Sequence, residues 1–180
     1  MTLKERIAPR STAEIKVLRG SIIWAFVLLL IDQFTKLLVE HNMVFGESIP
    51  VIRGFFSLTY ITNKGAAWGM FHGYGMMLFA IGMTVTALAI IFLRKLCDGY
   101  AERYAAILTV LSGVIGNSID RLWRGEVVDF LDCYINKYHW PAFNVADCAI
   151  CVGIGIYSLS VLLRPVPEVS SAPGVRDHEK

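Results

Sequence analysis

Two aspartates lie beside apolar sequence at positions where their carboxyl groups could do chemistry. Asp129 belongs to GEVVDF (residues 125–130), and Asp147 closes FNVAD (residues 143–147), directly before an apolar run. Paired carboxyl groups suit peptide hydrolysis, because an ionised one can take a proton from water while a protonated one donates to the carbonyl oxygen or the leaving amine. Like charges at close range cannot both ionise cheaply, so such a pair holds one proton over a broad pH range.

Further polar side chains are expected at the same depth as this pair. Asp32 lies roughly 16 Å along a helix that enters the membrane near Ser21, at about 1.5 Å per residue. The end of another predicted helix carries Asn117, Asp120 and Arg121, and Asp129 follows in the loop after it. Ionisable residues at membrane depth are costly, so a cluster of them is treated as a functional site.

Each member of this cluster also has a purely structural explanation. Asp32 and Lys36 are spaced i, i+4 and could neutralise each other on a helix face. Asn144 could cap a helix with Asp147 as its third residue, where the helix dipole favours an acid. Asp120 and Arg121 could form an ordinary pair at the membrane interface. Capping alone does not explain why Asp129 is expected at the same membrane depth as Asn117, Asp120 and Asp147.

Other kinds of catalytic site are disfavoured. His41, His72 and His139 are scattered, and none stands beside an obvious nucleophile. The chain has no HExxH motif, so no metal and no cofactor are expected. Cys148 and Cys151 have CxxC spacing but no second Cys or His pair nearby, and we predict that they are small buried apolar residues.

The composition indicates a membrane protein. Of 180 residues, 55% are hydrophobic and 18% charged, and the mean hydropathy is +0.54. The apolar share exceeds, and the charged share falls below, that of a typical soluble domain. A net charge of +2 with dispersed basic residues argues against a nucleic-acid partner.

Long apolar runs predict an all-α membrane protein with four transmembrane helices, because about 20 residues of helix cross the hydrocarbon core. The runs cover residues 21–39, 74–93, 104–119 and 148–163. The first resembles a signal peptide, but no small-x-small cleavage signature follows and the polar stretch DQFTK continues, so we expect a retained helix. FFSLTYIT (residues 55–62) has the partial alternation of a strand, and Asn63, Lys64 and Gly65 then supply a turn.

The basic residues predict the orientation, because loops rich in Lys and Arg stay in the cytoplasm. One side carries most of them: Lys4, Arg6, Arg10, Lys16, Arg19, Arg94, Lys95, Arg103, Arg164, Arg176 and Lys180. The opposite loops hold Arg53, Lys64, Arg121, Arg124 and Lys137. Both termini should therefore be cytoplasmic. We expect residues 1–20 to form a cytoplasmic segment, residues 21–163 the transmembrane domain, and residues 164–180 a disordered tail.

Several short motifs together resemble the lipoprotein signal peptidases, the type II signal peptidases of bacteria. The resemblance runs in order from about residue 31 to residue 163, and its motifs are DQFTK (residues 32–36), NKGAAWG (residues 63–69), GNSIDR (residues 116–121), GEVVDF and FNVAD. Trp68 stands where members of that family often have Phe.

The resemblance implies an intramembrane aspartic protease of the bacterial inner membrane, with a small periplasmic β element and its active site at the periplasmic face. Such an enzyme removes the signal peptide from prolipoproteins, cutting before a diacylglyceryl-modified cysteine. The implied catalytic pair is Asp129 and Asp147. Positions implied in substrate contact or support are Asn63, Gly65, Asn117, Asp120, Arg121, Asn144, Asp32 and Lys36.

The implied partners are diacylated prolipoproteins and membrane lipid, and we expect a monomer. The alternative interpretation is a small transporter or channel subunit whose buried acids relay ions. It predicts polar residues distributed across the membrane depth, whereas the charged residues here gather towards one side and residues 74–93 contain none.

Overall fold

The computed structural model describes residues 11–66 and 70–164 of the chain, so the predictions for the first ten residues, for Trp68 and for the tail beyond residue 164 lie outside it. Within those ranges it contains four helices long and apolar enough to cross a membrane. They are α2 (Thr12–Asn42), α3 (Gly75–Cys97), α4 (Ala101–Trp123) and α5 (Val145–Leu163). The predicted fold class, four membrane helices with a small β element, is confirmed.

The helices extend beyond the apolar runs that predicted them, because polar residues close their ends. The side chain of Ser11 accepts a hydrogen bond from the backbone N–H of Glu14, so α2 begins well before residue 21. At the same end of the molecule, α3 stops where Asp98 takes the left-handed conformation at a φ of 48°. The proposed division into residues 1–20, 21–163 and 164–180 stays a prediction.

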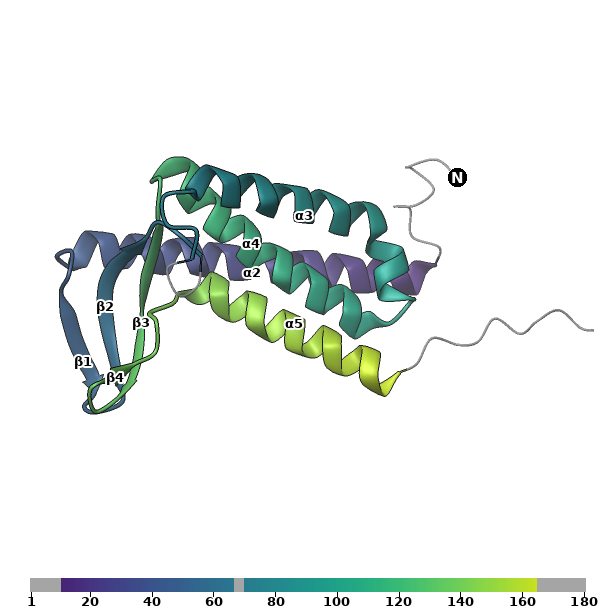
Figure 1. Ribbon diagram of the computed structural model, residues 1–180. Coiled ribbons are helices and arrows are strands. Elements are labelled where there is room, and N and C mark those ends of the chain that lie inside the picture. The colour runs from purple at the N-terminus through teal and green to yellow at the C-terminus, as the bar shows by residue number, and fades with distance from the viewer. Residues whose placement is uncertain (1–10, 67–69, 165–180) are drawn as a thin grey trace, which may run out of the picture.

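Helix α4 occupies the middle of the bundle and packs against α2, α3 and α5 (Figure 1). Along its length α4 buries a mixture of apolar and small polar side chains, among them Tyr104, Leu111 and Ser112. The outer helices instead expose large apolar side chains such as Phe26, Ile81 and Leu159. A surface of this kind is stable in lipid, where apolar side chains need no burial inside the protein.

A small residue, Gly113, allows α4 and α5 to approach closely. A Cβ atom placed on Gly113 would lie 2.2 Å from the backbone oxygen of Ala146, closer than any real contact. Because that oxygen belongs to the backbone at the start of α5, the helices would have to move apart to admit a methyl group. Gly155 lies on α5, and a Cβ atom placed there would have no other atom within 4 Å.

We therefore expect Gly113→Ala to lower the free energy of unfolding by about 1–3 kcal/mol, the usual range for overpacking. The matched variant Gly155→Ala should not lower it and should raise it by up to about 1 kcal/mol, because Ala favours a helix more than Gly does. Denaturation in detergent measures both. Equal stabilities of the two variants would show that the close helix contact is absent.

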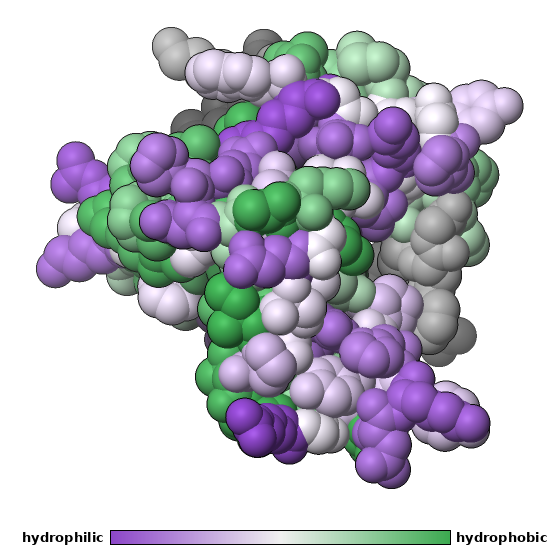
Figure 2. Space-filling view, turned by 90° about the vertical axis from the view of Figure 1, so that its left-hand side faces the viewer, coloured by the Kyte–Doolittle hydropathy of each residue, from purple (hydrophilic) through white to green (hydrophobic). Residues whose placement is uncertain are grey.

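A four-stranded antiparallel sheet stands at one end of the bundle, in the order β1-β2-β3-β4 (Figure 1). Its strands are β1 (Ser48–Ile52), β2 (Phe56–Asn63), β3 (Val127–Ile135) and β4 (Tyr138–His139). Figure 2 faces this end of the molecule and shows hydrophilic side chains gathered on it between apolar ones. The predicted strand over residues 55–62 corresponds to β2.

The prediction that Asp129 lies in a loop is wrong, because it lies within strand β3. There Asp129 is paired with Ile61 of β2, and its neighbours Val128 and Phe130 are buried. Branched and aromatic side chains favour a strand when a partner strand and a packed face are available. The partner is β2, which is distant in sequence, so the short run VVDF alone did not suggest pairing.

Candidate active site

Asp129 and Asp147 reach the same cavity from different elements. Asp129 lies on β3 and is 3% exposed, while Asp147 is half-buried in the first turn of α5. Both line a cavity of about 560 Å³ where the sheet meets the bundle. Three other predicted site residues, Asn63, Asn117 and Arg121, line it as well. The fold thus brings the two carboxyl groups to one cavity.

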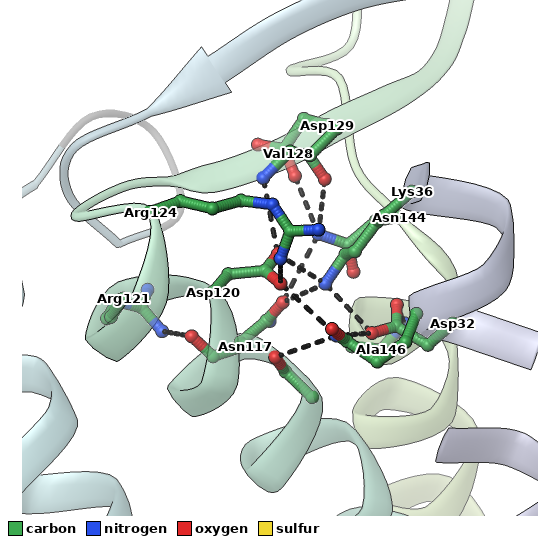
Figure 3. A network of polar contacts seen from close by, with 12 residues as sticks. Asp32, Lys36, Asn117, Asp120, Arg121, Arg124, Val128, Asp129, Asn144 and Ala146 are labelled. Atoms are coloured by element: carbon green, nitrogen blue, oxygen red, sulfur yellow. Dashed lines mark hydrogen bonds and ion pairs between the residues drawn. The ribbon is translucent and has the colours of Figure 1, made fainter. Parts of the chain in front are cut away.

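Two asparagine amides connect the carboxyl groups. Nδ2 of Asn117 donates to Oδ1 of Asp147 at 2.8 Å, and Nδ2 of Asn144 donates to Oδ1 of Asp129 at 2.7 Å. Nδ2 of Asn144 also lies 3.3 Å from Oδ1 of Asn117. A chain of hydrogen bonds therefore runs from one aspartate to the other. Figure 3 shows Asn117 of α4, Asp129 of β3 and Asn144 at the start of α5 close together.

Asn144 also caps α5, as the structural explanation predicted. Its Oδ1 accepts from the backbone N–H of Asp147 at 3.0 Å, and Oδ2 of Asp147 accepts from the backbone N–H of Asn144 at 3.2 Å. This reciprocal capping box fixes the first turn of the helix. Capping and a role in the site are compatible. The cap holds Asp147 in place, and Oδ1 of Asp147 still accepts the hydrogen bond from Nδ2 of Asn117.

Lys36 and Asp32 form the expected ion pair, but in the protein interior. Nζ of Lys36 lies 2.9 Å from Oδ2 of Asp32, 2.8 Å from Oδ2 of Asp120 and 3.0 Å from Oδ1 of Asn117. Both side chains of the pair are at most 1% exposed. Oδ1 of Asp32 accepts from the backbone N–H of Ala146 at 2.8 Å. The pair therefore ties α2 to α4 and to the start of α5.

Asp120 pairs with Lys36 and Arg124 rather than with its neighbour Arg121. Oδ1 of Asp120 lies 2.8 Å from Nη1 of Arg124, whose guanidinium also pairs with Glu40 at 2.8 Å. Oδ2 of Asp120 accepts from the backbone N–H of Val128 at 3.3 Å, which holds the start of β3. Sequence reasoning missed Arg124 and Glu40, although each is spaced i, i+4 from a predicted residue.

Arg121 instead spans from α4 to the turn after β2. Its Nη1 donates to the backbone oxygen of Asn117 at 3.2 Å and its Nη2 to that of Gly65 at 3.0 Å. Among the described residues, its buried Nε has no hydrogen-bond partner. Gly65 is needed for space, because a Cβ atom there would lie 2.4 Å from the backbone oxygen of Met70. Oδ1 of Asn63 accepts from the N–H of Gly65 at 2.9 Å.

The remaining walls of the cavity are largely apolar, and the sequence did not single them out. They comprise Ala66, Val127, Trp140, Pro141, Ala142, Phe143, Cys148, Ile150, Cys151 and Val152. The prediction that Cys148 and Cys151 are buried is wrong, since Cys151 is exposed and Cys148 is partly so. Both cysteines lie on α5, and they line the cavity instead of the protein core. The apolar residues on this side of α5 therefore form the cavity wall and the surface that faces lipid.

Burial and the neighbouring Asp147 raise the pKa of Asp129 to about 7, with burial as the larger cause. Hydrogen bonds from Asn144 and Asn63 and the charge of Lys36 oppose this rise. A carboxyl group in such surroundings holds its proton near neutral pH, which is the protonation state that a general acid requires.

The raised pKa of Asp129 predicts how stability depends on pH. An Asp in the unfolded chain has a pKa near 3.9, so between about pH 4 and 7 the folded state binds more protons. The contribution of Asp129 to the free energy of unfolding therefore falls as pH rises through this window. We expect Asp129→Asn to gain stability relative to the wild type from pH 4 to 7. Denaturation at a series of pH values tests this, and parallel curves for the two proteins would contradict it.

Comparison with known proteins supplies an independent line of information. Residues 24–163 match the family model described as signal peptidase (SPase) II. The chain is 47% identical to the lipoprotein signal peptidase of Geobacter sulfurreducens over 137 residues, which are 74% of this chain and 86% of that protein. It is 42% identical to the lipoprotein signal peptidase of Bacillus pumilus over 141 residues, or 77% of this chain and 90% of that one. A solved bacterial membrane enzyme is similar with a TM-score of 0.74 at 32% identity, covering 87% of this chain and 94% of its own.

Proposed function

The chain belongs to the signal peptidase II family of aspartic peptidases, which remove signal peptides from prolipoproteins, and on that premise we propose that Asp129 and Asp147 are its catalytic pair. The observation that carries this proposal is the opening of both carboxyl groups into one cavity, joined through Asn117 and Asn144. The family assignment excludes the alternative of a transporter or channel subunit.

In the proposed reaction the aspartate pair activates water for direct attack on the scissile carbonyl, with no covalent intermediate. One carboxyl group takes a proton from water and the other donates to the carbonyl oxygen. Burial favours one ionised and one protonated group, because two neighbouring carboxyl groups in a low dielectric do not both ionise at neutral pH.

Arg121 and Asn63 are suited to bind the substrate beside this pair. The unpartnered Nε of Arg121 is available to a substrate carbonyl or a lipid ester oxygen, and the Asn63 amide lines the same cavity. Contacts to a polar group of the substrate would satisfy a donor that is otherwise buried without a partner. The apolar walls contributed by Phe143 and Ile150 are suited to receive acyl chains.

We further propose that the site faces the periplasm and that the substrate is cut before its diacylglyceryl-modified cysteine. The distribution of basic residues supports the orientation, since Arg94, Lys95, Arg103 and Arg164 all belong to the helix ends away from the sheet (Figure 1). The chain is a multi-pass membrane protein, and a monomer would suffice for this chemistry because both aspartates come from one chain.

A cleavage assay with purified protein tests the substrate proposal. A diacylated prolipoprotein and the same chain without lipid are incubated with the enzyme, and the cut is mapped by mass spectrometry. We expect cleavage directly before the cysteine of the diacylated chain and at least about tenfold slower cleavage of the other. Equal rates on both, or a cut elsewhere, would contradict the proposed specificity.

A further inference from the structure

The orientation of both bridging amides is fixed by partners outside the aspartate pair. Nζ of Lys36 can only donate hydrogen bonds, so the Asn117 oxygen must face it at 3.0 Å and the Asn117 Nδ2 must face Asp147. In the same way, the oxygen of Asn144 accepts from the backbone N–H of Asp147, which turns the Asn144 Nδ2 towards Asp129. Neither amide can flip without losing a partner.

As a result the two carboxyl groups receive unequal support for a negative charge. Asp147 accepts the Asn117 Nδ2 on one oxygen at 2.8 Å and the backbone N–H of Asn144 on the other at 3.2 Å. It also lies in the first turn of α5, where the helix dipole favours an anion. Each of these features favours a carboxylate at Asp147.

Asp129 has weaker support, because its donors are shared. Nδ2 of Asn144 carries two hydrogens but faces three acceptors, namely Oδ1 of Asp129 at 2.7 Å, the backbone oxygen of Val128 at 3.2 Å and Oδ1 of Asn117 at 3.3 Å. The Asn63 amide also contacts Asp129, and it is shared with the backbone oxygen of Ala66 at 3.4 Å. A strand offers no helix dipole to compensate.

The surrounding charges do not reverse this asymmetry. From α2 the pair faces Asp32 and Lys36, and from α4 it faces Asp120 and Arg121. The charge of Lys36 is already shared between two carboxylates at 2.9 and 2.8 Å. Arg121 lines the same cavity as both aspartates, so its charge does not single out Asp129.

This inference rests on the proposed function. We propose that Asp129 carries the shared proton in the resting enzyme and that Asp147 is the carboxylate that takes a proton from water. Lys36 and Asn117 are positioning residues that set which of the two aspartates is protonated. The hydroxide formed at Asp147 then bonds to the carbonyl carbon while Asp129 gives its proton to the carbonyl oxygen. As the C–N bond breaks, Asp147 returns its proton to the amine nitrogen. A hydroxyl proton of the intermediate restores Asp129, so the pair ends as it began.

Infrared titration of single-aspartate variants tests the assignment without relying on cleavage. The absorption of a protonated carboxyl group is followed against pH in Asp147→Asn, which leaves Asp129, and in Asp129→Asn, which leaves Asp147. We expect the protonated band to persist to higher pH in Asp147→Asn than in Asp129→Asn. The reverse order would overturn the assignment.

A further variant tests the positioning role of Asn117. In the Asp129→Asn background, Asn117→Leu removes the donor to Asp147, so the midpoint of the Asp147 band should rise by about one pH unit or more. Asn42→Leu, at the exposed end of α2, should leave it unchanged and serves as the control. An unmoved midpoint in the Asn117 variant would overturn the positioning role.

The outcomes also separate this inference from the proposed function. If the wild type cleaves the diacylated substrate but the infrared order is reversed, the proton assignment fails while the catalytic pair stands. If neither Asp→Asn change reduces cleavage, the catalytic pair itself fails. Each variant is first compared with the wild type by circular dichroism, so that loss of the fold is recognised.

Discussion

Replacing Asp147 by Asn, or Asp129 by Asn, is expected to lower the kcat for prolipoprotein cleavage by about 10²–10⁴-fold or more, the range attributed to a single acid or base group. Asn is nearly the same size as Asp, so the cavity and most contacts should survive. The amide cannot exchange protons with water or with the carbonyl oxygen at neutral pH. The loss should therefore appear in kcat while the protein stays folded in the membrane.

Asp132 offers a matched control on the same strand. It is buried like Asp129, but its carboxyl group contacts His139 at 2.9 Å and it is not among the residues that line the cavity. We expect Asp132→Asn to keep kcat within about threefold of the wild type. Full activity in Asp129→Asn or Asp147→Asn, or an equal loss in Asp132→Asn, would contradict the assigned roles.

The largest expected effect on stability comes from Lys36. Lys36→Met leaves Asp32 and Asp120 buried, at 1% and 0% exposure, without the cation that they share. Removing one partner of a buried ion pair typically costs about 3–5 kcal/mol, because the remaining charge stays out of water. We expect a loss of this size in the free energy of unfolding, measured by denaturation in detergent.

The double variant Asp32→Asn with Lys36→Met separates charge from packing. It removes one acid together with the base, while Asp120 keeps its pair with Arg124 at 2.8 Å. The oxygen of an Asn at position 32 can still accept from the backbone N–H of Ala146. The double variant should therefore recover a substantial part of the lost stability. If it were no more stable than Lys36→Met alone, packing of the Lys36 side chain rather than its charge would be responsible.

The helices of this fold could be predicted from hydropathy because a bilayer imposes a minimum length on apolar helices. The start of α2 could not, since Ser11 extends that helix through a cap that the apolar run does not record, whereas the cap of α5 by Asn144 was predicted from the sequence. The strand that carries Asp129 was missed for a different reason. Its pairing with β2 is set by how the chain returns from α4, which no local pattern in VVDF reveals.

The sequence could predict which polar residues belong to the site, but not which of them contact one another. Asn117, Asp120 and Arg121 are spaced to share a helix face, so their grouping was foreseeable. Their partners were not, because the contact of Lys36 with Asn117, and of Arg124 with Glu40, depends on how α2 and α4 align side by side. For the same reason the sequence suggested a pair of Asp120 with Arg121 as a structural alternative, whereas Asp120 pairs with Lys36 and Arg124.

A crystal structure with a substrate-derived inhibitor tests the central claim most directly. The inhibitor is a diacylated peptide in which a secondary alcohol replaces the scissile amide carbonyl, so that its hydroxyl marks the position of the reacting oxygen. We expect that hydroxyl to lie within hydrogen-bonding distance of the carboxyl groups of both Asp129 and Asp147. A hydroxyl bound away from either carboxyl group would contradict the assignment of the catalytic pair.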